Sequence, residues 1–458
     1  MPKIYSSKRV ATARRPRAAN RYVGPTINQV GDRGYLALLS ILFWLIFYMN
    51  MPDNLNGLAG TGLIVTGNVL NRNLKVGMIA MSLYFIATRW SLARSLAKNI
   101  NVGATAFLVL AALSAVWSIE PAATILRFIS LAAICLVCFA ISLAGWHSRR
   151  FQHLAIPPLM FILIVSLVVG IIHPDRIAEI GTDISQKGSW HGITHSKNEF
   201  GMTASFAAII CVNRWLAREG RTYWAIVGAA VAFACLLLSR GDTSILATIV
   251  GVLSMVLLMR VSGVKQRYST HVVVAIAAII LFYELVIQNV IPGVSVLMAP
   301  ITSLTGKDTT FSARTIIWKV IKDHIQGAPY LGTGYGAYWL GPIPTSPSYV
   351  FLSLMNFYPT EAHNGYLEIL NDLGILGLIC LLVFLFSFMR QALQLMRIDR
   401  SQAALYLALL FQEMVINMSE SDWFSRTNTF AIFALGIACL SRGLLEASPA
   451  RAPGRTGG

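Results

Sequence analysis

The sequence is poor in charged residues. Of its 458 residues only 12% are Asp, Glu, Lys or Arg, whereas 55% are hydrophobic. Soluble domains carry about 25% charged residues, so this balance argues against a soluble enzyme and favours a polytopic membrane protein. The net charge of +17 would suggest nucleic acid in a soluble protein. In a membrane protein Lys and Arg gather on cytoplasmic loops instead, and no nucleic-acid partner is predicted.

The sequence also lacks the signals of a disulfide, metal or nucleotide site. All six cysteines fall inside apolar runs, which excludes a disulfide framework. Cys135 and Cys138 have a redox-type spacing but no histidine partner, so they are interpreted as core residues. The glycines of "GTGYG" (332–336) follow no strand and belong to no nucleotide fingerprint, and allow tight turns or a close substrate approach. Neither a metal nor a cofactor is predicted.

Long apolar runs dominate the chain. A helix needs 17 to 25 such residues to cross about 30 Å of hydrocarbon, and twelve runs are interpreted as spans: 35–51, 74–90, 103–118, 122–144, 155–173, 199–216, 222–239, 243–259, 271–290, 366–389, 402–418 and 427–445. The Gly-rich segment 57–70 is interpreted as re-entrant or surface-lying. With the N-terminus inside, the inner segments hold more than twice as many Lys and Arg as the outer ones, as the positive-inside rule requires.

The predicted fold is therefore all-α, with about twelve transmembrane helices and one long external loop that contains short amphipathic helices. Both termini are expected in the cytoplasm. The predicted divisions are a basic tail (1–34), helices one to nine (35–290), the external loop (291–365), helices ten to twelve (366–445) and a C-terminal tail (446–458).

Two arginines stand out within or between these spans. Arg127 lies about six residues, or roughly 9 Å, inside its span. An intramembrane arginine often marks an anion site, although its long side chain could also reach the interface. Arg240 lies in a hinge of a few residues, where it could bind an anion, anchor at the interface or pair with Asp242.

The external loop carries further candidates. Ser312 is a plausible N-cap of an amphipathic helix whose apolar stripe suits a membrane surface, and the stripe consists of Ile317, Val320, Ile321 and Ile325. Arg314, in the first turn of this helix, suits a phosphate. His363 precedes the tenth span, where the helix dipole favours a neutral imidazole that can act as a general base, although a capping histidine is the alternative.

Other polar residues converge on the same face. His195 and Lys197 lie in "HSKNEFG" and could contact sugar or phosphate, whereas a metal there lacks a third ligand. Glu420 and Asp422 lie in a short loop for which solvation is the simpler interpretation.

These segments together resemble the O-antigen ligase/polymerase superfamily, and most closely its exopolysaccharide-polymerase branch of the succinoglycan type. The matching pieces, in the family's order, are "WSIEP" (117–121), "HSKNEFG" (195–201), "LSRGDTS" (238–244), "GKDTTFSARTIIW" (306–318), "PYLGTGYGAYW" (329–339), "AHNGYLEILNDLGILGL" (362–378) and "NMSES" (417–421). The family usually has Gly-Arg where this chain has Ala313-Arg314, and its spacing around Arg240 also differs.

The resemblance implies a metal-independent, inverting glycosyltransferase of the bacterial inner membrane. Its donor would be a glycan on undecaprenyl diphosphate, transferred at the periplasmic face to the hydroxyl of another lipid-linked repeat unit. On this interpretation Arg240 and Arg314 bind the diphosphate and His363 is the general base. The expected substrate-binding residues are Arg127, His195, Lys197, Asn364, Tyr335 and Trp339.

Two alternatives remain open. A ligase would transfer the glycan to lipid A–core or another terminal acceptor, and only the resemblance favours the polymerase. A transporter or flippase would show internal repeats and several acidic residues near the midplane, whereas the spans hold only scattered glutamates. Beyond membrane lipid and the lipid-linked oligosaccharide, a chain-length regulator is a candidate partner.

Overall fold

Each predicted span overlaps a helix. The computed structural model describes residues 30–49, 69–178, 188–218, 220, 222–260, 266–290, 312–355 and 358–447. The overlapping helices are α1 (Val30–Met49), α2 (Val69–Thr88), α4 (Val102–Leu113), α5 (Pro121–Ser142), α6 (Arg150–Ile172), α7 (Lys197–Leu216), α8 (Thr222–Ser239), α9 (Asp242–Arg260), α10 (Gln266–Ile287), α14 (Gly365–Leu395), α15 (Arg400–Ile416) and α16 (Asn428–Ala447). Within the described ranges the regular secondary structure is helical, apart from one isolated bridge between Ala178 and Trp190.

Seven of the described helices are long and apolar enough to cross a membrane. An eighth results if α2 and the following α3 (Trp90–Ala97), bent by 97°, count as one broken span. The count of twelve stays a prediction, since α4 has only 12 residues and α15 only 17. Most of the segment 57–70 lies outside the described residues.

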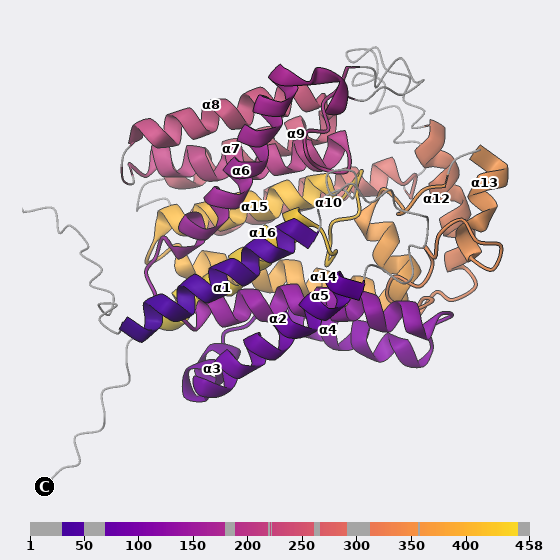
Figure 1. Cartoon of the computed structure of the whole chain (residues 1–458), viewed down its shortest axis with the longest axis horizontal. Coiled ribbons are helices and arrows are strands. Elements are labelled where there is room, and N and C mark those ends of the chain that lie inside the picture. Colours follow the sequence, from indigo (N-terminus) through magenta and orange to yellow (C-terminus); the bar gives the residue numbers. More distant parts are fainter. Residues whose placement is uncertain are drawn as a thin grey trace, which may run out of the picture.

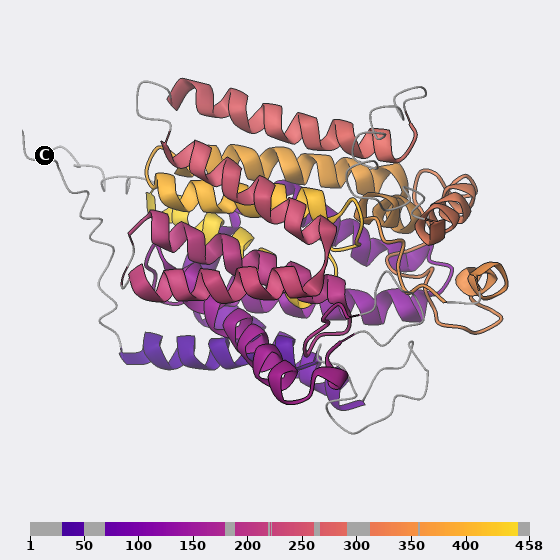
Figure 2. The ribbon, with the colours of Figure 1, turned by 90° about the horizontal axis from the view of Figure 1, so that it is seen from above.

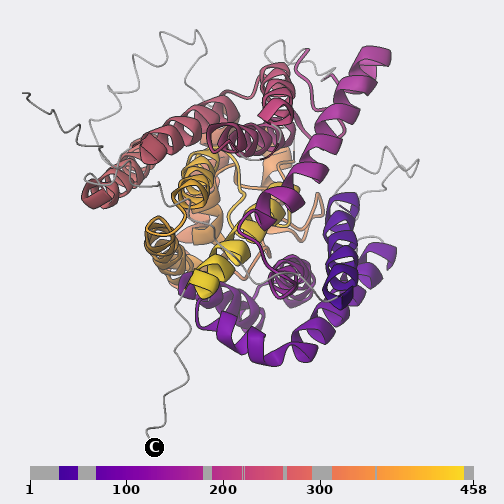
Figure 3. The same ribbon diagram turned by 90° about the vertical axis from the view of Figure 1, so that its left-hand side faces the viewer.

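The helices run side by side along the long axis, and α15 and α16 lie among them (Figure 1). Seen end-on, α15 and α16 lie between the α1–α5 group and the α6–α9 group (Figure 3). The side chains of α15 from Gln402 to Ile416 are all buried. By contrast, α10 lies at one edge of the bundle (Figure 2) and exposes Ile279 and Phe282. Apolar side chains on outer helices are what a lipid-facing surface requires.

Polar side chains fix where several helices begin. The side chain of Asn101 accepts a hydrogen bond from Ala104 N at the start of α4, and Asp399 accepts one from Gln402 N at the start of α15. Such caps satisfy amides that have no partner within the helix. Pro121 opens α5, where its fixed φ suits the first turn and no N–H is needed. Helix starts are therefore encoded locally.

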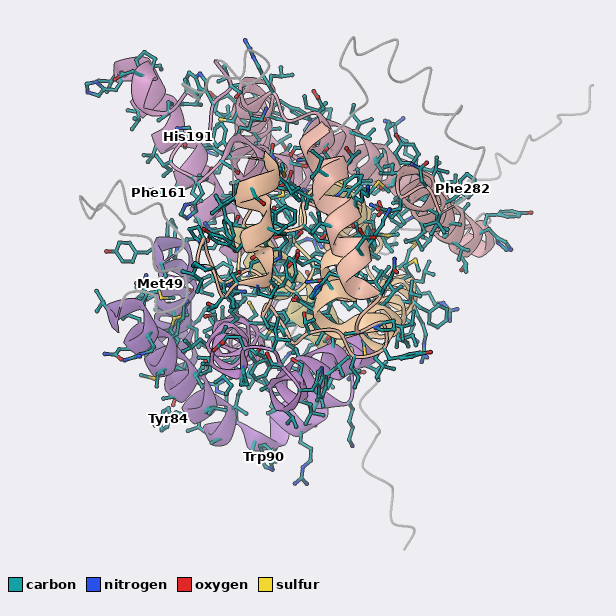
Figure 4. The ribbon with its side chains drawn as sticks, turned by 90° about the vertical axis from the view of Figure 1, so that its right-hand side faces the viewer. Met49, Tyr84, Trp90, Phe161, His191 and Phe282 are labelled. Atoms are coloured by element: carbon teal, nitrogen blue, oxygen red, sulfur yellow. The ribbon has the colours of Figure 1, made fainter. Side chains whose placement is uncertain are left out.

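The described part of the predicted external loop, residues 312–355 and 358–364, packs at one end of the bundle. Its helices α12 (Ser312–Ile325) and α13 (Val350–Met355) cover that end (Figures 1 and 4), while the labelled Tyr84 and Phe282 lie at the periphery. The expected stripe on α12 exists, but the membrane is not its partner. Its members pack instead on side chains of the loop and of α14: Tyr338, Trp339, Phe351, Ala362 and Leu367. The periodicity correctly predicted an apolar face and was wrong about what covers it.

Candidate functional site

His363 lies at the centre of a cluster of charged side chains. Its Nδ1 is 3.1 Å from Glu361 Oε1 and 3.3 Å from Glu420 Oε2. His363 has a φ of 49°, a left-handed conformation that is uncommon for residues other than glycine. The turn places Glu361 and His363 together just before α14 begins.

Glu420 joins three separate segments. Its Oε1 accepts a hydrogen bond from Arg314 Nη2 of α12 and another from Asn198 Nδ2 of α7, each at 2.7 Å. Because Oε2 faces His363, the single carboxylate ties the two helices to the start of α14. The prediction of a solvated loop is wrong, since Glu420 is 8% and Asp422 1% exposed. Sequence analysis missed this burial.

The electrostatics of the cluster correct a second expectation. Burial alone would lower the pKa of His363, but its hydrogen bonds to Glu361 and Glu420 and their charges raise it to about 10. The prediction of a neutral imidazole from the helix dipole is therefore wrong, because two carboxylates outweigh partial charges. Burial raises the pKa of Glu361, and the charge of Glu420 adds to this. For Glu420, burial is outweighed by His363 and Arg314, and its pKa is lowered.

Asn364 caps α14. Its Oδ1 accepts hydrogen bonds from the amides of Tyr366 and Leu367, which makes it the N-cap of α14. Its Nδ2 donates to Glu284 Oε1 at 2.8 Å, and the residue is fully buried. Asn364 therefore has a structural role at the start of α14, and its contact with the glycan stays a prediction.

The glycine-rich segment 329–341 docks on α14. Gly334 N donates to Asp372 O and Gly336 N donates to Asp372 Oδ2, while Trp339 Nε1 donates to Glu368 Oε1. A Cβ on Gly334 (φ +105°) would lie 2.4 Å from Ser118 Oγ, so only glycine fits. The expected tight turns are present. The close approach, however, is to the protein's own backbone and side chains, since these glycines are packed against them.

A cavity of about 410 Å³ opens beside this segment and the cluster. Its aromatic lining consists of Phe107, Tyr335, Trp339, Tyr358, Trp423 and Phe424. Its carboxyl groups come from Glu199, Glu361, Glu368 and Asp372, and its basic side chains are Lys75, Arg127, His195 and Arg426. Aromatic faces with many hydrogen-bonding groups suit a polyhydroxylated ligand such as a sugar.

The site residues predicted from the sequence lie in the His363 cluster, in the lining of the cavity or near them. Arg314 and His363 meet at Glu420, whereas Arg127, His195, Tyr335 and Trp339 line the cavity. Arg127 also donates to the carbonyl of Trp339. Lys197 is the first residue of α7, after the capping Ser196. Arg240 has a φ of 50° in the α8–α9 hinge, and Thr243 at the start of α9 accepts a hydrogen bond from Ser419 of the same loop as Glu420.

Sequence analysis missed Glu361, Lys75 and Arg426. Glu361 lies two residues before His363, so its proximity was visible in the sequence. Lys75 was visible as a charge in a predicted span, and Nζ donates to Ser130 Oγ of α5 at 3.0 Å. Arg426 lies in the short loop before α16, and no pattern in the sequence distinguished it.

The cluster also satisfies a simple geometric test for a metal site. Ligand atoms of Glu361, His363 and Glu420 lie within 4.8 Å of one another. However, both carboxylates approach the same imidazole nitrogen, and Glu420 already accepts from Arg314 and Asn198. The donor set therefore fits an internal ion-pair network better than a cation site.

The chain is similar in sequence to known proteins. Residues 206–382 match the family model Wzy_C, described as O-antigen ligase. The chain is 28% identical to the exopolysaccharide production protein ExoQ of Rhizobium meliloti (strain 1021) over 322 residues. This aligned region covers 67% of this chain and 69% of ExoQ. The resemblance stated from the sequence is confirmed, and the protein is a multi-pass membrane protein whose residues 206–382 match the O-antigen ligase family model.

Proposed function

We propose that this chain, with its O-antigen ligase domain, is a polymerase that joins glycan repeat units at the periplasmic face of the bacterial inner membrane. The donor is a glycan on undecaprenyl diphosphate, and the acceptor is a sugar hydroxyl of another lipid-linked repeat unit. The observation that carries the proposal is the position of the His363 cluster. It borders a cavity whose aromatic and hydrogen-bonding side chains suit a sugar. The similarity to a protein of exopolysaccharide production supports it.

The reaction is a direct, inverting displacement. The acceptor oxygen attacks the anomeric carbon, and the lipid diphosphate leaves with the bonding electrons. Arg314 and Arg240 are assigned to the diphosphate, because guanidinium groups match phosphate oxygens in geometry and charge. Arg314 donates to Glu420 through Nη2, which places its guanidinium in the His363 cluster. Arg127 assists from the cavity wall.

The proton of the acceptor hydroxyl passes to the cluster of Glu361, His363 and Glu420, for which the sequence predicted His363 as the essential member. A positioned base contributes about 10² to 10⁴ in rate. His363→Ala should therefore abolish polymer while the protein still inserts into the membrane. Unchanged polymer length in that variant would remove the assignment. No step requires a metal.

A ligase is the second candidate, favoured by the description of the matching family. Deleting the gene and analysing surface glycans separates the two. Single repeat units without high-mass polysaccharide support the polymerase, whereas lipid-linked polymer that accumulates without transfer supports the ligase. An unchanged glycan profile would contradict both. A chain-length regulator is proposed as a partner of the polymerase.

A further inference from the structure

We infer that Glu361 is the catalytic residue that accepts the proton of the attacking hydroxyl, and that His363 holds it in position. This inference rests on the proposed function and deepens it, by naming the member of the cluster that meets the acceptor sugar.

The first argument is access to the cavity. Of the three side chains that meet at His363 Nδ1, Glu361 is the one that lines the cavity of about 410 Å³. Glu420 is directed instead toward Arg314 and Asn198, whose donors occupy its Oε1. A general base must come within hydrogen-bond reach of the proton that it removes. The geometry therefore favours Glu361 over Glu420 and His363.

The second argument is the hydrogen bonding of the carboxylates in the cavity. Glu368 accepts from Trp339 Nε1 and from Ala362 N, and Asp372 accepts from Gly336 N. These groups hold the fold of the loop. Among the described residues, no guanidinium or amide donates to Glu361, whose carboxyl group meets the imidazole of His363 at 3.1 Å and the carboxyl group of Glu420.

The third argument is charge. His363 carries a proton through neutral pH because two carboxylates raise its pKa, so it has no lone pair to offer there. Burial raises the pKa of Glu361 and makes its carboxylate a better base than an exposed glutamate. The ionisable groups that face Glu361 come from α7, α14, its own segment and the 417–427 loop: Glu199, His363, Glu368, Glu420 and Asp422. Arg314 of α12 reaches the cluster through Glu420.

The step balances without any further reactant. The O–H bond of the acceptor breaks and its proton moves to Glu361, while the oxygen forms a bond to the anomeric carbon. The bond between that carbon and the phosphate oxygen breaks, and its electrons leave with the diphosphate. Glu361 then returns its proton to water in the cavity, and nothing is oxidised or reduced.

The test uses the full chain, purified into lipid nanodiscs, with lipid-linked repeat units extracted from a strain that lacks the gene. Initial rates of polymer formation are measured against pH for the natural protein, Glu361→Gln, Glu361→Asp and His363→Gln. Asp175→Asn, an exposed carboxylate between α6 and α7, is the matched control. Binding of the lipid-linked unit and thermal unfolding are recorded for each variant.

The natural protein should lose activity as the pH falls through the raised pKa of Glu361, because the base becomes protonated. Glu361→Gln should lower kcat by about 10² to 10⁴ and change KM less than threefold. Its rate should no longer fall at low pH, so the acid limb of the pH–rate profile should be absent. Glu361→Asp should keep the limb at a lower rate, which preserves the test if the Gln variant fails to fold. Asp175→Asn should behave like the natural protein.

Three results would overturn the inference. The first is a rate of Glu361→Gln within threefold of the natural rate. The second is a Glu361→Gln variant that still loses activity at low pH while His363→Gln does not, which would make His363 the base. Chelation could abolish activity that magnesium restores, which would make Glu361 a ligand. A natural protein that transfers glycan to no acceptor would instead refute the proposed function itself.

Discussion

The charge of His363 can be tested directly by replacing Glu420 with glutamine. The substitution keeps the shape of the side chain and an oxygen that can accept from Arg314 and Asn198, but it removes one of the two negative charges beside the imidazole. Removing that charge should lower the pKa of His363, because the imidazolium loses one of two stabilising partners.

The size of this shift follows from the distance. His363 Nδ1 lies 3.3 Å from Glu420 Oε2, and two unit charges at such separations interact by on the order of 4 kcal/mol at an effective dielectric constant near 20. One pKa unit corresponds to about 1.4 kcal/mol, so the upper limit is about 3 units. Because Glu361 remains at 3.1 Å, we expect the pKa of His363 to fall by about 1 to 3 units and to stay above its ordinary value.

Histidine ring nitrogens labelled with ¹⁵N report protonation by NMR, and His363→Gln identifies the resonance by its absence. In the natural protein the imidazolium should persist well above pH 7, whereas in Glu420→Gln it should deprotonate at a lower pH. His147 is an internal control, since burial and the nearby Arg150 lower its pKa to about 4 and it should stay neutral throughout. If His363 titrates near pH 6.5 in the natural protein, or at the same pH in both proteins, the electrostatic reasoning is refuted.

Three further outcomes are expected. Arg314→Lys should reduce the transfer rate by about 10²-fold or more, since lysine lacks the planar fork; full activity would argue against diphosphate contact. Trp339→Phe should lower the free energy of unfolding by about 1 to 3 kcal/mol, because it leaves Glu368 Oε1 without its donor; an unchanged thermal midpoint would contradict this. A topology reporter fused after Thr345 should be read on the periplasmic side, and a cytoplasmic signal would overturn the proposed orientation and every site built on it.

The helices could be predicted from the sequence because the membrane leaves few alternatives. A backbone in hydrocarbon must satisfy its own hydrogen bonds, so each long apolar run becomes a helix. The amphipathic helix of the loop was also predictable, although Ser312, expected as its N-cap, is already its first residue. The number of crossings was not, since the short α4 and the fully buried α15 show that an apolar run can fill a bundle interior as well as face lipid.

The site could be predicted only in part, because its geometry depends on contacts between distant segments. His363 and Arg314 were recognised as residue types with suitable chemistry. Their meeting point, Glu420, lies 57 residues after His363 and 106 after Arg314. Its position depends on how the loop between α15 and α16 packs, which no local pattern records. The helix-dipole argument for a neutral His363 failed because it left out both carboxylates, the nearby Glu361 and the distant Glu420.

Residue type alone would also suggest Glu368 and Asp372 as catalytic carboxylates. Glu368 and Asp372 lie in the cavity beside Arg127 and resemble catalytic acids. Their hydrogen bonds to Trp339 and Gly336 show that they anchor the glycine-rich segment on α14 instead. Gly374 (φ +60°) interrupts α14 just beyond them, and a Cβ there would lie 2.4 Å from the carbonyl carbon of Tyr330.

The N-terminal half of α14 therefore positions two parts of the cavity lining, the turn with Glu361 and the aromatic residues around Trp339. Its cap, Asn364, fixes the turn that carries Glu361 and His363, and its next two turns fix the aromatic wall around Trp339. A substitution that shifts this half-helix should disturb proton transfer and glycan binding together. One that acts on Glu361 alone should change proton transfer and leave binding intact. The division between kcat and KM thus distinguishes the base from the framework that positions it.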